Sequence, residues 1–266
     1  MSFAEASGLI RIDDKTWQGE IQPHWDILGN ANGGYLLAIA ARAGVLASGR
    51  PDPVTITGHF LAPAAAGPIR VATEILKEGR RLATVRSEIF NGDGRRLVAT
   101  LGSYGELGPA DTPERVDAEP PDLPPVDDCV RVVATETFPP PFMGQVDLRL
   151  HPEDVPFGAT GSSGHPRVRG WFRWPDDEVI DTIGLVVAVD AFPPTIFNAN
   201  LPAAWSPTIE LTSHIRERPT VGEWLRCSFN TRFITGGFLE EDGELWDESG
   251  RLIAQSRQLA LLPQGA

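Results

Sequence analysis

Two stretches of the sequence are apolar on almost every side, and this feature limits the folds open to the chain. The first spans 35–43 and follows Asn32, a residue type that favours the start of a helix. The second follows Pro175-Asp176-Asp177 and runs to Phe192, where Pro193 stops a helix. A helix with no polar face must be surrounded by other elements. We therefore expect one long buried helix in each half of the chain.

Strand-like runs follow both apolar stretches, and turn residues separate these runs. In the first half the runs span 69–76, 82–90 and 96–104, and in the second half they span 208–215, 224–235, 239–246 and 252–262. Such runs with Gly-rich turns between them are typical of antiparallel strands. Each half is therefore predicted to be a helix followed by an antiparallel sheet.

The two halves also agree in register. A separation of 155 positions pairs like residues of the two halves: His59 with His214, Leu97 with Leu252, and Ala99 with Ala254. The phrase at 94–99 returns at 250–254 with a slip of one residue. Duplicated units usually pack against one another, and a curved sheet can wrap an apolar helix. The sequence predicts an α+β fold of the double hotdog type, with two repeats that each have a long buried helix wrapped by a curved antiparallel β-sheet.

The segment between the halves differs from both in composition. Prolines and acidic residues dominate 108–125, where missing backbone donors and like charges favour an extended, solvated chain. We predict an N-terminal hotdog repeat over 1–107, a Pro-rich acidic linker over 108–128 and a C-terminal hotdog repeat over 129–266. A second loop-like region, rich in Gly and Ser, lies at 151–166.

Charge and composition argue against several functional classes. The 266 residues include 23 Lys and Arg against 36 Asp and Glu, and the net charge of −13 disfavours nucleic acid and anionic membranes as partners. Cys129 and Cys227 are too few and too far apart for a disulfide framework or a cysteine zinc site. The beginning of the sequence lacks a secretory pattern, and the apolar stretch at 35–47 is too short to cross a bilayer. We expect a soluble, cytoplasmic protein.

Motifs of several common chemistries are missing from the sequence. It has no GxSxG nucleophile elbow, no phosphate-binding GxxxxGK[ST] loop and no GxGxxG after a strand. The five histidines form no metal-binding pair, and we expect His59 and His214 to be structural strand residues. Neither apolar stretch contains a histidine that could act as the base of a dehydration reaction. No metal and no cofactor are expected.

Several phrases, in the same order along the chain, resemble the acyl-CoA thioesterase II family. In the first half they are Asn32-Gly33-Gly34-Tyr35, Gly58-His59-Phe60-Leu61-Ala62-Pro63, Gly67-Pro68 and Glu78-Gly79-Arg80. In the second half they are Asp190 and the phrases at 205–211, 236–239 and 247–258. The resemblance implies a double hotdog that hydrolyses fatty acyl-CoA through an Asp, a Thr or Ser, and a Gln that hold one water. The matching positions are Asp190, Thr208 and Gln258, with coenzyme A as part of the substrate.

The residues themselves agree with these implied roles to different degrees. Asp190 lies among valines next to Phe192, a setting that raises the pKa of a carboxylate, although it can equally serve to tie the helix end to a strand. Gln258 shares the inward face of its strand with Ala260. Thr208 is in phase with the outward residues of its strand, so its role depends on the resemblance.

Backbone amides and arginines supply the remaining candidate site residues. The amides at Gly33, Gly34 and Tyr35 begin the first buried helix, where a substrate carbonyl could accept hydrogen bonds, or where the glycines serve only a tight entry turn. Arg80 and Arg216 follow strands and are candidates to meet the phosphates of coenzyme A; alternatively, they belong to a solvated charged rim.

The expected function is that of an acyl-CoA thioesterase with Asp190-activated water. At the offset of 155 positions the first repeat carries other residues: Tyr35 for Asp190, Pro53 for Thr208 and Ser103 for Gln258. One active site per chain, between the repeats, follows from this asymmetry. The alternatives are a non-hydrolytic acyl-CoA-binding hotdog protein whose trio is structural, and a scaffold protein. Assembly of chains through the hotdog sheets stays open.

Overall fold

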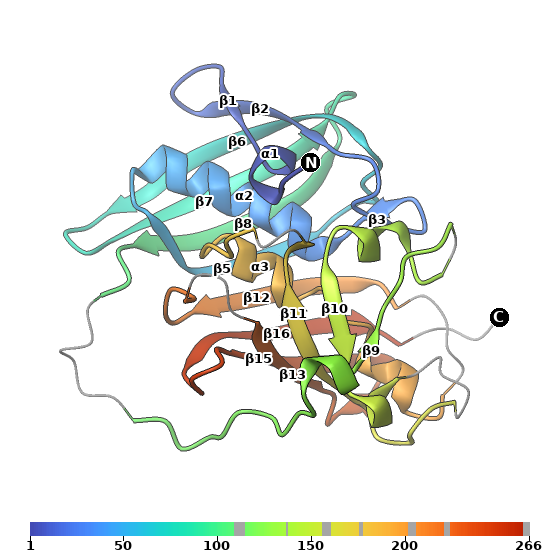
Figure 1. The fold of residues 1–266 in the computed structure, drawn as a ribbon. Helices are drawn as coiled ribbons and strands as arrows, with labels where there is room; N and C mark the ends of the chain where they lie inside the picture. Colours follow the sequence, from blue (N-terminus) through green and yellow to red (C-terminus); the bar gives the residue numbers. More distant parts are fainter. Residues whose placement is uncertain are drawn as a thin grey trace.

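Among the residues that the structure describes, one antiparallel sheet of 14 strands runs through both halves of the chain (Figure 1). The computed structural model describes residues 1–108, 115–136, 138–155, 161–175, 178–201, 206–220 and 224–262. The strands of the first half are β1 (Ile10–Arg11), β2 (Thr16–Ile21), β5 (Asp52–Phe60), β6 (Gly67–Glu78), β7 (Leu82–Asn91) and β8 (Arg96–Gly105). Those of the second half are β9 (Val130–Arg131), β10 (Asp147–Leu150), β11 (Arg167–Arg173), β12 (Thr208–Ile215), β13 (Leu225–Asn230), β14 (Ile234–Thr235), β15 (Phe238–Trp246) and β16 (Leu252–Leu261).

The order of the strands joins the two halves in the middle of this sheet. It is β1-β2-β6-β7-β8-β5-β12-β16-β15-β13-β11-β10-β9, with β14 beside β15 and a separate hairpin of β3 (Asp26–Ile27) and β4 (Asn30–Ala31). The helices are α1 (Phe3–Ala6), α2 (Gly33–Ser48) and α3 (Gly184–Ala188), and the 3₁₀ turns are η1 (Val126–Asp128), η2 (Pro141–Gly144), η3 (Pro152–Asp154) and η5 (Thr195–Asn198). In the described part of the chain, no helix has the length and apolarity that a membrane span requires.

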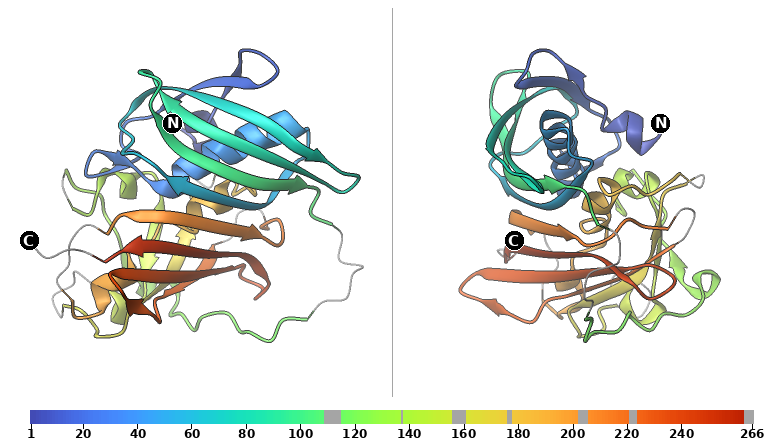
Figure 2. Two further views of the ribbon diagram at one scale, coloured as in Figure 1. Left: turned by 180° about the vertical axis from the view of Figure 1, so that it is seen from behind. Right: turned by 90° about the vertical axis from the view of Figure 1, so that its left-hand side faces the viewer.

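Helix α2 is the buried helix predicted for the first half, and the sheet of that half curves around it (Figure 2). Asn32 caps it as predicted, since its Oδ1 accepts a hydrogen bond from the amide of Tyr35 at 2.9 Å. Gly49, with φ of 64°, ends the helix in the left-handed conformation that glycine tolerates. Gly44 lets β8 approach, because a Cβ at this position would lie 2.1 Å from Cζ of Tyr104.

The prediction of a second long helix that runs to Phe192 is wrong. Helix α3 has five residues and packs against α2 (Figure 1). Before it, the carboxylate of Asp181 accepts a hydrogen bond from the amide of Gly184 at 2.6 Å and holds the preceding residues in a turn. Its sequence is rich in valine, whose β-branched side chain loses freedom in a helix, so apolarity here reflects burial more than helix length.

Strands β5 and β12 pair with each other and make the two sheets continuous. In this ladder Thr57 lies opposite Thr212, which is 155 positions further along the chain, and their Oγ1 atoms are 2.8 Å apart. Both strands carry an irregularity at the matching place, between Pro53 and Thr55 in β5 and between Thr208 and Glu210 in β12. The predicted duplication therefore appears as an approximate two-fold relation between the halves.

The offset changes by one residue in the next strand of each half. Ile56 pairs with Gly102, and its equivalent Leu211 pairs with Gln258. Gly102 is therefore the counterpart of Gln258, and the assignment of Ser103 to that position is wrong. The slip of one residue between 94–99 and 250–254 was the sign of this shift in the sequence.

The segment predicted as a linker carries no strand or helix over 115–125 before η1, while 109–114 lies outside the described residues. The described part runs along the outside of the second half (Figure 2). The indole of Trp171 donates a hydrogen bond to the carbonyl of Pro124 at 3.0 Å. This contact ties the segment to β11.

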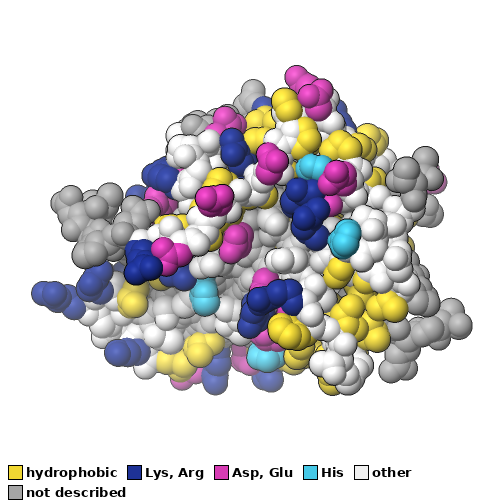
Figure 3. Space-filling model, turned by 90° about the horizontal axis from the view of Figure 1, so that it is seen from below, with side chains coloured by type: hydrophobic (Ala, Val, Ile, Leu, Met, Phe, Trp, Pro, Cys, Tyr) yellow, Lys and Arg dark blue, Asp and Glu magenta, His cyan; other side chains and the backbone are white. Residues whose placement is uncertain are grey.

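Charged side chains of both signs are interspersed over the face drawn in Figure 3. Many arginines are held in ion pairs with acidic neighbours. Asp242, for example, accepts from Nε of Arg257 at 2.6 Å and from Nη2 of Arg232 at 2.8 Å. Local pairing of this kind keeps such arginines engaged within the protein.

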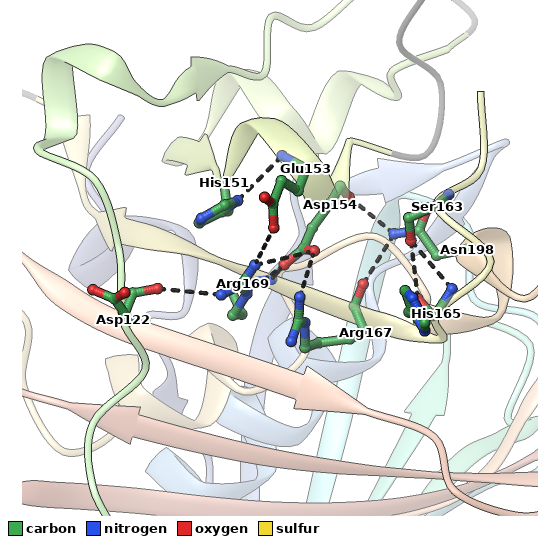
Figure 4. Close-up of polar contacts among 9 residues, drawn as sticks. All are labelled: Asp122, His151, Glu153, Asp154, Ser163, His165, Arg167, Arg169 and Asn198. Carbon is green, nitrogen blue, oxygen red and sulfur yellow. Dashed lines mark hydrogen bonds and ion pairs between the residues drawn. The ribbon is translucent and has the colours of Figure 1, made fainter. Parts of the chain in front are cut away.

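The loop-like region at 151–166 is held by a buried carboxylate (Figure 4). Residues 156–160 of it lie outside the described part. Asp154 is 1% exposed, and its side chain accepts from Nε of Arg169 at 2.7 Å and from Nη2 of Arg167 at 3.4 Å. Nδ2 of Asn198 donates to the backbone carbonyl of Asp154 at 3.0 Å. These bonds attach the start of the loop to β11 and η5, which accounts for the buried charge structurally.

We expect Gly44→Ala to destabilise the protein by about 1–3 kcal/mol, the usual cost of overpacking a core. The added methyl group would overlap the ring of Tyr104. In an unobstructed helix the same change would stabilise by about 1 kcal/mol. Urea unfolding measures the difference. Gly92→Ala, where the nearest atom to an added Cβ is 3.5 Å away, is the control, and a stabilised Gly44→Ala variant would contradict the packing described here.

Candidate functional site

The carboxylate of Asp190 lies against the first turn of α2. Its Oδ2 accepts a hydrogen bond from the amide of Gly34 at 2.7 Å and another from Nδ2 of Asn32 at 3.1 Å. The same Nδ2 donates to the backbone carbonyl of Asp190 at 2.9 Å. Asp190 follows the end of α3 by two residues, and its carboxylate lies at the positive, N-terminal end of α2. Among the described residues, none donates a hydrogen bond to the other carboxylate oxygen, Oδ1.

The two glycines at the start of α2 allow this close approach. A Cβ on Gly34 would lie 2.8 Å from Cβ of Asp190 and 2.9 Å from the carbonyl oxygen of Val186. A Cβ on Gly33 would lie 2.9 Å from Cζ of Phe60 and 3.0 Å from Oδ2 of Asp190. Any larger residue would therefore push α3 and its acid away from the helix start.

Burial controls the acidity of Asp190. It raises the pKa of the carboxyl group to about 6, against the opposing effect of the hydrogen bonds from Gly34 and Asn32, which favour the charged form. The direction agrees with the expectation from its apolar sequence neighbours. Near neutral pH the group is ionised, and its pKa lies close enough to 7 for it to accept a proton from water.

Thr208 and Gln258 meet on neighbouring strands. Oγ1 of Thr208 lies 3.3 Å from Oε1 of Gln258, to which it donates. Simple alternation along β12 places Thr208 on the outward face. The irregularity between Thr208 and Glu210 breaks that alternation and lets the hydroxyl reach the inward-facing amide. The sequence offers only Pro207 as a hint of this change.

Glu241 is a residue of the site that the sequence reasoning missed. It lies on β15 opposite Gln258, whose Nε2 donates to its Oε1 at 3.2 Å. Burial raises the pKa of Glu241 to about 7, and the nearby charge of Asp190 adds to this effect, whereas hydrogen bonds from Thr195 oppose it. A signal was present, because three consecutive acidic residues at 240–242 in one strand must send at least one side chain inward.

These groups share one cavity of about 660 Å³. Its polar lining includes Asn32, Asp190, Thr208, Glu241 and Gln258, together with the backbone of Gly33. Apolar side chains form most of the rest: Ile27, Leu28, Leu36, Phe60, Leu61, Val132, Phe138, Met143, Phe192, Phe197 and Leu239. Within the described part of the chain, no Lys, Arg or His side chain lines it. The cavity suits an apolar chain that ends in a neutral, reactive group.

Two of the three predicted backbone donors are already engaged. The amide of Gly34 donates to Asp190, and that of Tyr35 donates to the capping oxygen of Asn32. In the described residues, the amide of Gly33 has no acceptor, and Gly33 lines the cavity. The side chain of Tyr35 lies in the core, where its ring stacks on Trp25 with centroids 4.5 Å apart. The structure does not bring Tyr35 to the cavity.

Arg80 and Arg216 are exposed and do not line the cavity. Arg80 follows Gly79, whose carbonyl accepts from Arg50 at 2.9 Å just beyond the end of α2, roughly 24 Å from the start of that helix. Arg216 follows the end of β12 that lies away from Thr208, and its Nη2 donates to Gln255 at 3.0 Å. Both arginines thus lie outside the cavity itself, and their contact with the phosphates of coenzyme A stays a prediction.

Sequence models of two thioesterase domains match the chain in tandem. The acyl-CoA thioesterase N-terminal domain matches residues 21–105, and the acyl-CoA thioesterase C-terminal domain matches residues 116–262. Uncharacterized proteins of Mycobacterium bovis and Mycobacterium tuberculosis are 28% identical, and the match covers 98% of this chain and 98% of theirs.

Solved structures share the whole fold. A protein of Thermobifida fusca provisionally named a thioesterase II is 30% identical over 98% of this chain and 97% of its own, with a TM-score of 0.87. A provisionally named thioesterase of Novosphingobium aromaticivorans is 25% identical over 96% and 98%, with a TM-score of 0.80. A protein with a hot dog fold from Alicyclobacillus acidocaldarius, 21% identical over 99% and 98%, has a TM-score of 0.87.

The two domain models follow each other in the order of the two halves and together cover most of the sequence. The chain therefore belongs to the acyl-CoA thioesterase family and is a thioester hydrolase.

Proposed function

We propose that the protein hydrolyses fatty acyl-CoA to a free acid and coenzyme A with a water molecule activated by Asp190. The observation that supports this most is the position of the carboxylate. One of its oxygens is held by the start of α2, and it shares a cavity with Thr208 and Gln258. Asp190 acts as general base, and Thr208 and Gln258 orient the water. No metal or prosthetic group takes part, and one such site serves each chain.

The reaction needs one proton acceptor and one oxyanion donor. The water oxygen attacks the thioester carbonyl carbon while Oδ1 of Asp190 takes one of its protons. The negative charge moves to the carbonyl oxygen, where the amide of Gly33 and the positive end of α2 stabilise it. Collapse of this intermediate breaks the carbon–sulfur bond and releases the thiolate of coenzyme A. Asp190 then returns its proton to solvent or to the thiolate.

The acyl chain fits the apolar part of the cavity. Phe60, Phe192 and Leu239 are among the side chains that line it, and they exclude water from the bound chain. The coenzyme A portion then extends from the thioester toward the protein surface. This assignment places the protein in lipid metabolism, as a consumer of activated fatty acids.

We expect Asp190→Asn to lower kcat at least ~100-fold, the scale of losing a general base. A thiol-detecting assay over a panel of acyl-CoA chain lengths measures the release of coenzyme A. Asp93→Asn, which changes an exposed acid in the turn between β7 and β8, is the control and keeps its activity. A folded Asp190→Asn variant with normal turnover contradicts the mechanism. Tight acyl-CoA binding by the wild type without hydrolysis of any chain length favours the non-hydrolytic alternative.

The pH dependence of kcat/KM tests the state of Asp190. Activity is expected to fall as the pH drops through about 6, because protonation removes the base. Asn32→Ser keeps a residue that can cap α2 but removes the Nδ2 donor to the charged carboxylate. In this variant the fall in kcat/KM on acidification is expected to occur at a pH that is higher by ~0.5–1 unit, because the charged carboxylate has lost a donor. A profile that does not move in the variant contradicts the assignment of this titration to Asp190.

The raised pKa of Asp190 also makes a prediction about stability. Its value of about 6 in the folded protein exceeds the ordinary 3.8, so its favourable contribution is complete below pH 3.8 and is lost as the pH rises through 6. Asp190→Asn is therefore expected to be more stable than the wild type at pH 8, by about 1–3 kcal/mol. Below pH 4 the two proteins are expected to unfold alike. Urea unfolding at both pH values measures this, and a less stable variant at pH 8 contradicts the buried-charge interpretation.

A further inference from the structure

Glu241 is a buried carboxylate that the reaction above does not use. Its side chain is 8% exposed and lines the cavity. Its Oε2 accepts from the amide of Thr195 at 2.8 Å and from the hydroxyl of Thr195 at 2.7 Å. Its Oε1 accepts from Nε2 of Gln258 at 3.2 Å. Both oxygens are therefore engaged by the protein, so Glu241 acts on its neighbours and does not bind substrate directly.

The partner of Glu241 is a side chain with two different ends. The amide of Gln258 can present its oxygen or its nitrogen in either direction, at nearly equal size. A carboxylate can only accept hydrogen bonds, so Nε2 must face Glu241. The oxygen of Gln258 is then directed to Thr208, whose hydroxyl lies 3.3 Å away. One charge on β15 thus sets the direction of the hydrogen bonds along Glu241, Gln258 and Thr208.

The surroundings hold Glu241 itself in one orientation. Thr195 is fully buried, and its Oγ1 lies 2.7 Å from Oγ1 of Thr231. The hydroxyl of Thr231 donates to the backbone carbonyl of Glu240 at 2.7 Å. Because this last acceptor is a carbonyl, the proton of Thr231 is used there, and the one hydroxyl proton of Thr195 has two possible acceptors, Thr231 and Glu241. The amide of Thr195 can only donate, so it fixes Oε2 of Glu241 as an acceptor whatever the hydroxyl does.

We propose that Glu241 is a positioning residue that fixes the amide of Gln258 in the orientation that the attacking water requires. This inference rests on the proposed function and adds to it a residue outside the predicted trio. In a neutral Glu241 the proton belongs on Oε1, because Oε2 accepts from the amide of Thr195 and the hydroxyl oxygen of a carboxylic acid is the weaker acceptor. The amide of Gln258 would then turn over and offer its nitrogen to Thr208. Loss of the charge therefore disturbs the water without removing the base.

The titration of Glu241 supports this role. Burial and the charges of Asp190 and Glu240 raise the pKa of Glu241 to about 7, and the hydrogen bonds from Thr195 oppose this rise. The pKa values of both Glu241 and Asp190 thus lie near neutral pH, at about 7 and about 6. The wild-type activity is therefore expected to fall in two steps on acidification, near 7 and near 6. Glu241→Gln resembles the protonated acid at all pH values, so its profile is expected to retain only the lower step.

The kinetic test compares Glu241→Gln with Glu240→Gln, a variant with the same charge change one residue away. We expect Glu241→Gln to lower kcat ~10-fold with KM within about two-fold of the wild type, as for loss of a transition-state interaction. Glu240 accepts from the amides of Arg232 and Phe233, so Glu240→Gln is expected to keep kcat within about two-fold. Equal kcat values for the wild type and Glu241→Gln, or retention of the step near pH 7, would overturn the proposal.

A double variant separates positioning from a general loss of structure. If Glu241 acts through Gln258, adding Glu241→Gln to Gln258→Ala is expected to lower kcat no further. Additive losses would overturn the proposal. If Glu241→Gln does not fold, Thr195→Val replaces it, since it removes one donor to Glu241; a smaller fall in kcat supports the proposal and an unchanged kcat opposes it. Normal activity in both Asp190→Asn and Gln258→Ala would instead reject the proposed function itself.

Discussion

The hydrogen bonds between Asp190 and the first turn of α2 join the two halves of the molecule at the point where the cavity lies. They are made by Asn32 and Gly34, which belong to the first half, and by an acid of the second half. The contact needs glycines on one side and a very short helix on the other. If α3 were as long as α2, its acid would lie elsewhere. The interaction therefore accounts for both the glycines and the early end of α3.

The duplicated halves have acquired different tasks around this contact. The first supplies a long helix whose start is electropositive and part of the apolar lining, and the second supplies Asp190, Thr208, Glu241 and Gln258. The pairing of β5 with β12 keeps these contributions in a fixed relation, because it makes the two sheets one. Within this frame two acids face one cavity, and the charge of Asp190 adds to the effect of burial in raising the pKa of Glu241.

Features with strong local causes could be predicted from the sequence, and features decided by packing could not. Helix α2, its cap at Asn32 and the repeat offset at Thr57 and Thr212 follow from apolar periodicity, capping chemistry and self-similarity. The length of α3 could not be predicted, because an apolar run shows burial without showing how long a helix is. The hydroxyl of Thr208 reaches inward only because its strand is irregular at that point. Glu241 had to be recognised from which side chains of β15 point into the protein. Arg80 and Arg216 do not line the cavity, and the sequence could not show this because motif order along the chain does not give distances in space.

The slip of one residue between β8 and β16 has a consequence for the space at the counterpart of Gln258. At the counterpart of Gln258 the first half carries Gly102, where an added Cβ would lie 2.7 Å from the hydroxyl oxygen of Tyr104. The ring of Tyr104 also presses on Gly44. A second site in the first half could not be made here by exchanging residues one for one, since the ring of Tyr104 fills the space that a side chain at Gly102 would need. The two halves thus differ at this position in the space that is free for a side chain as well as in chemistry.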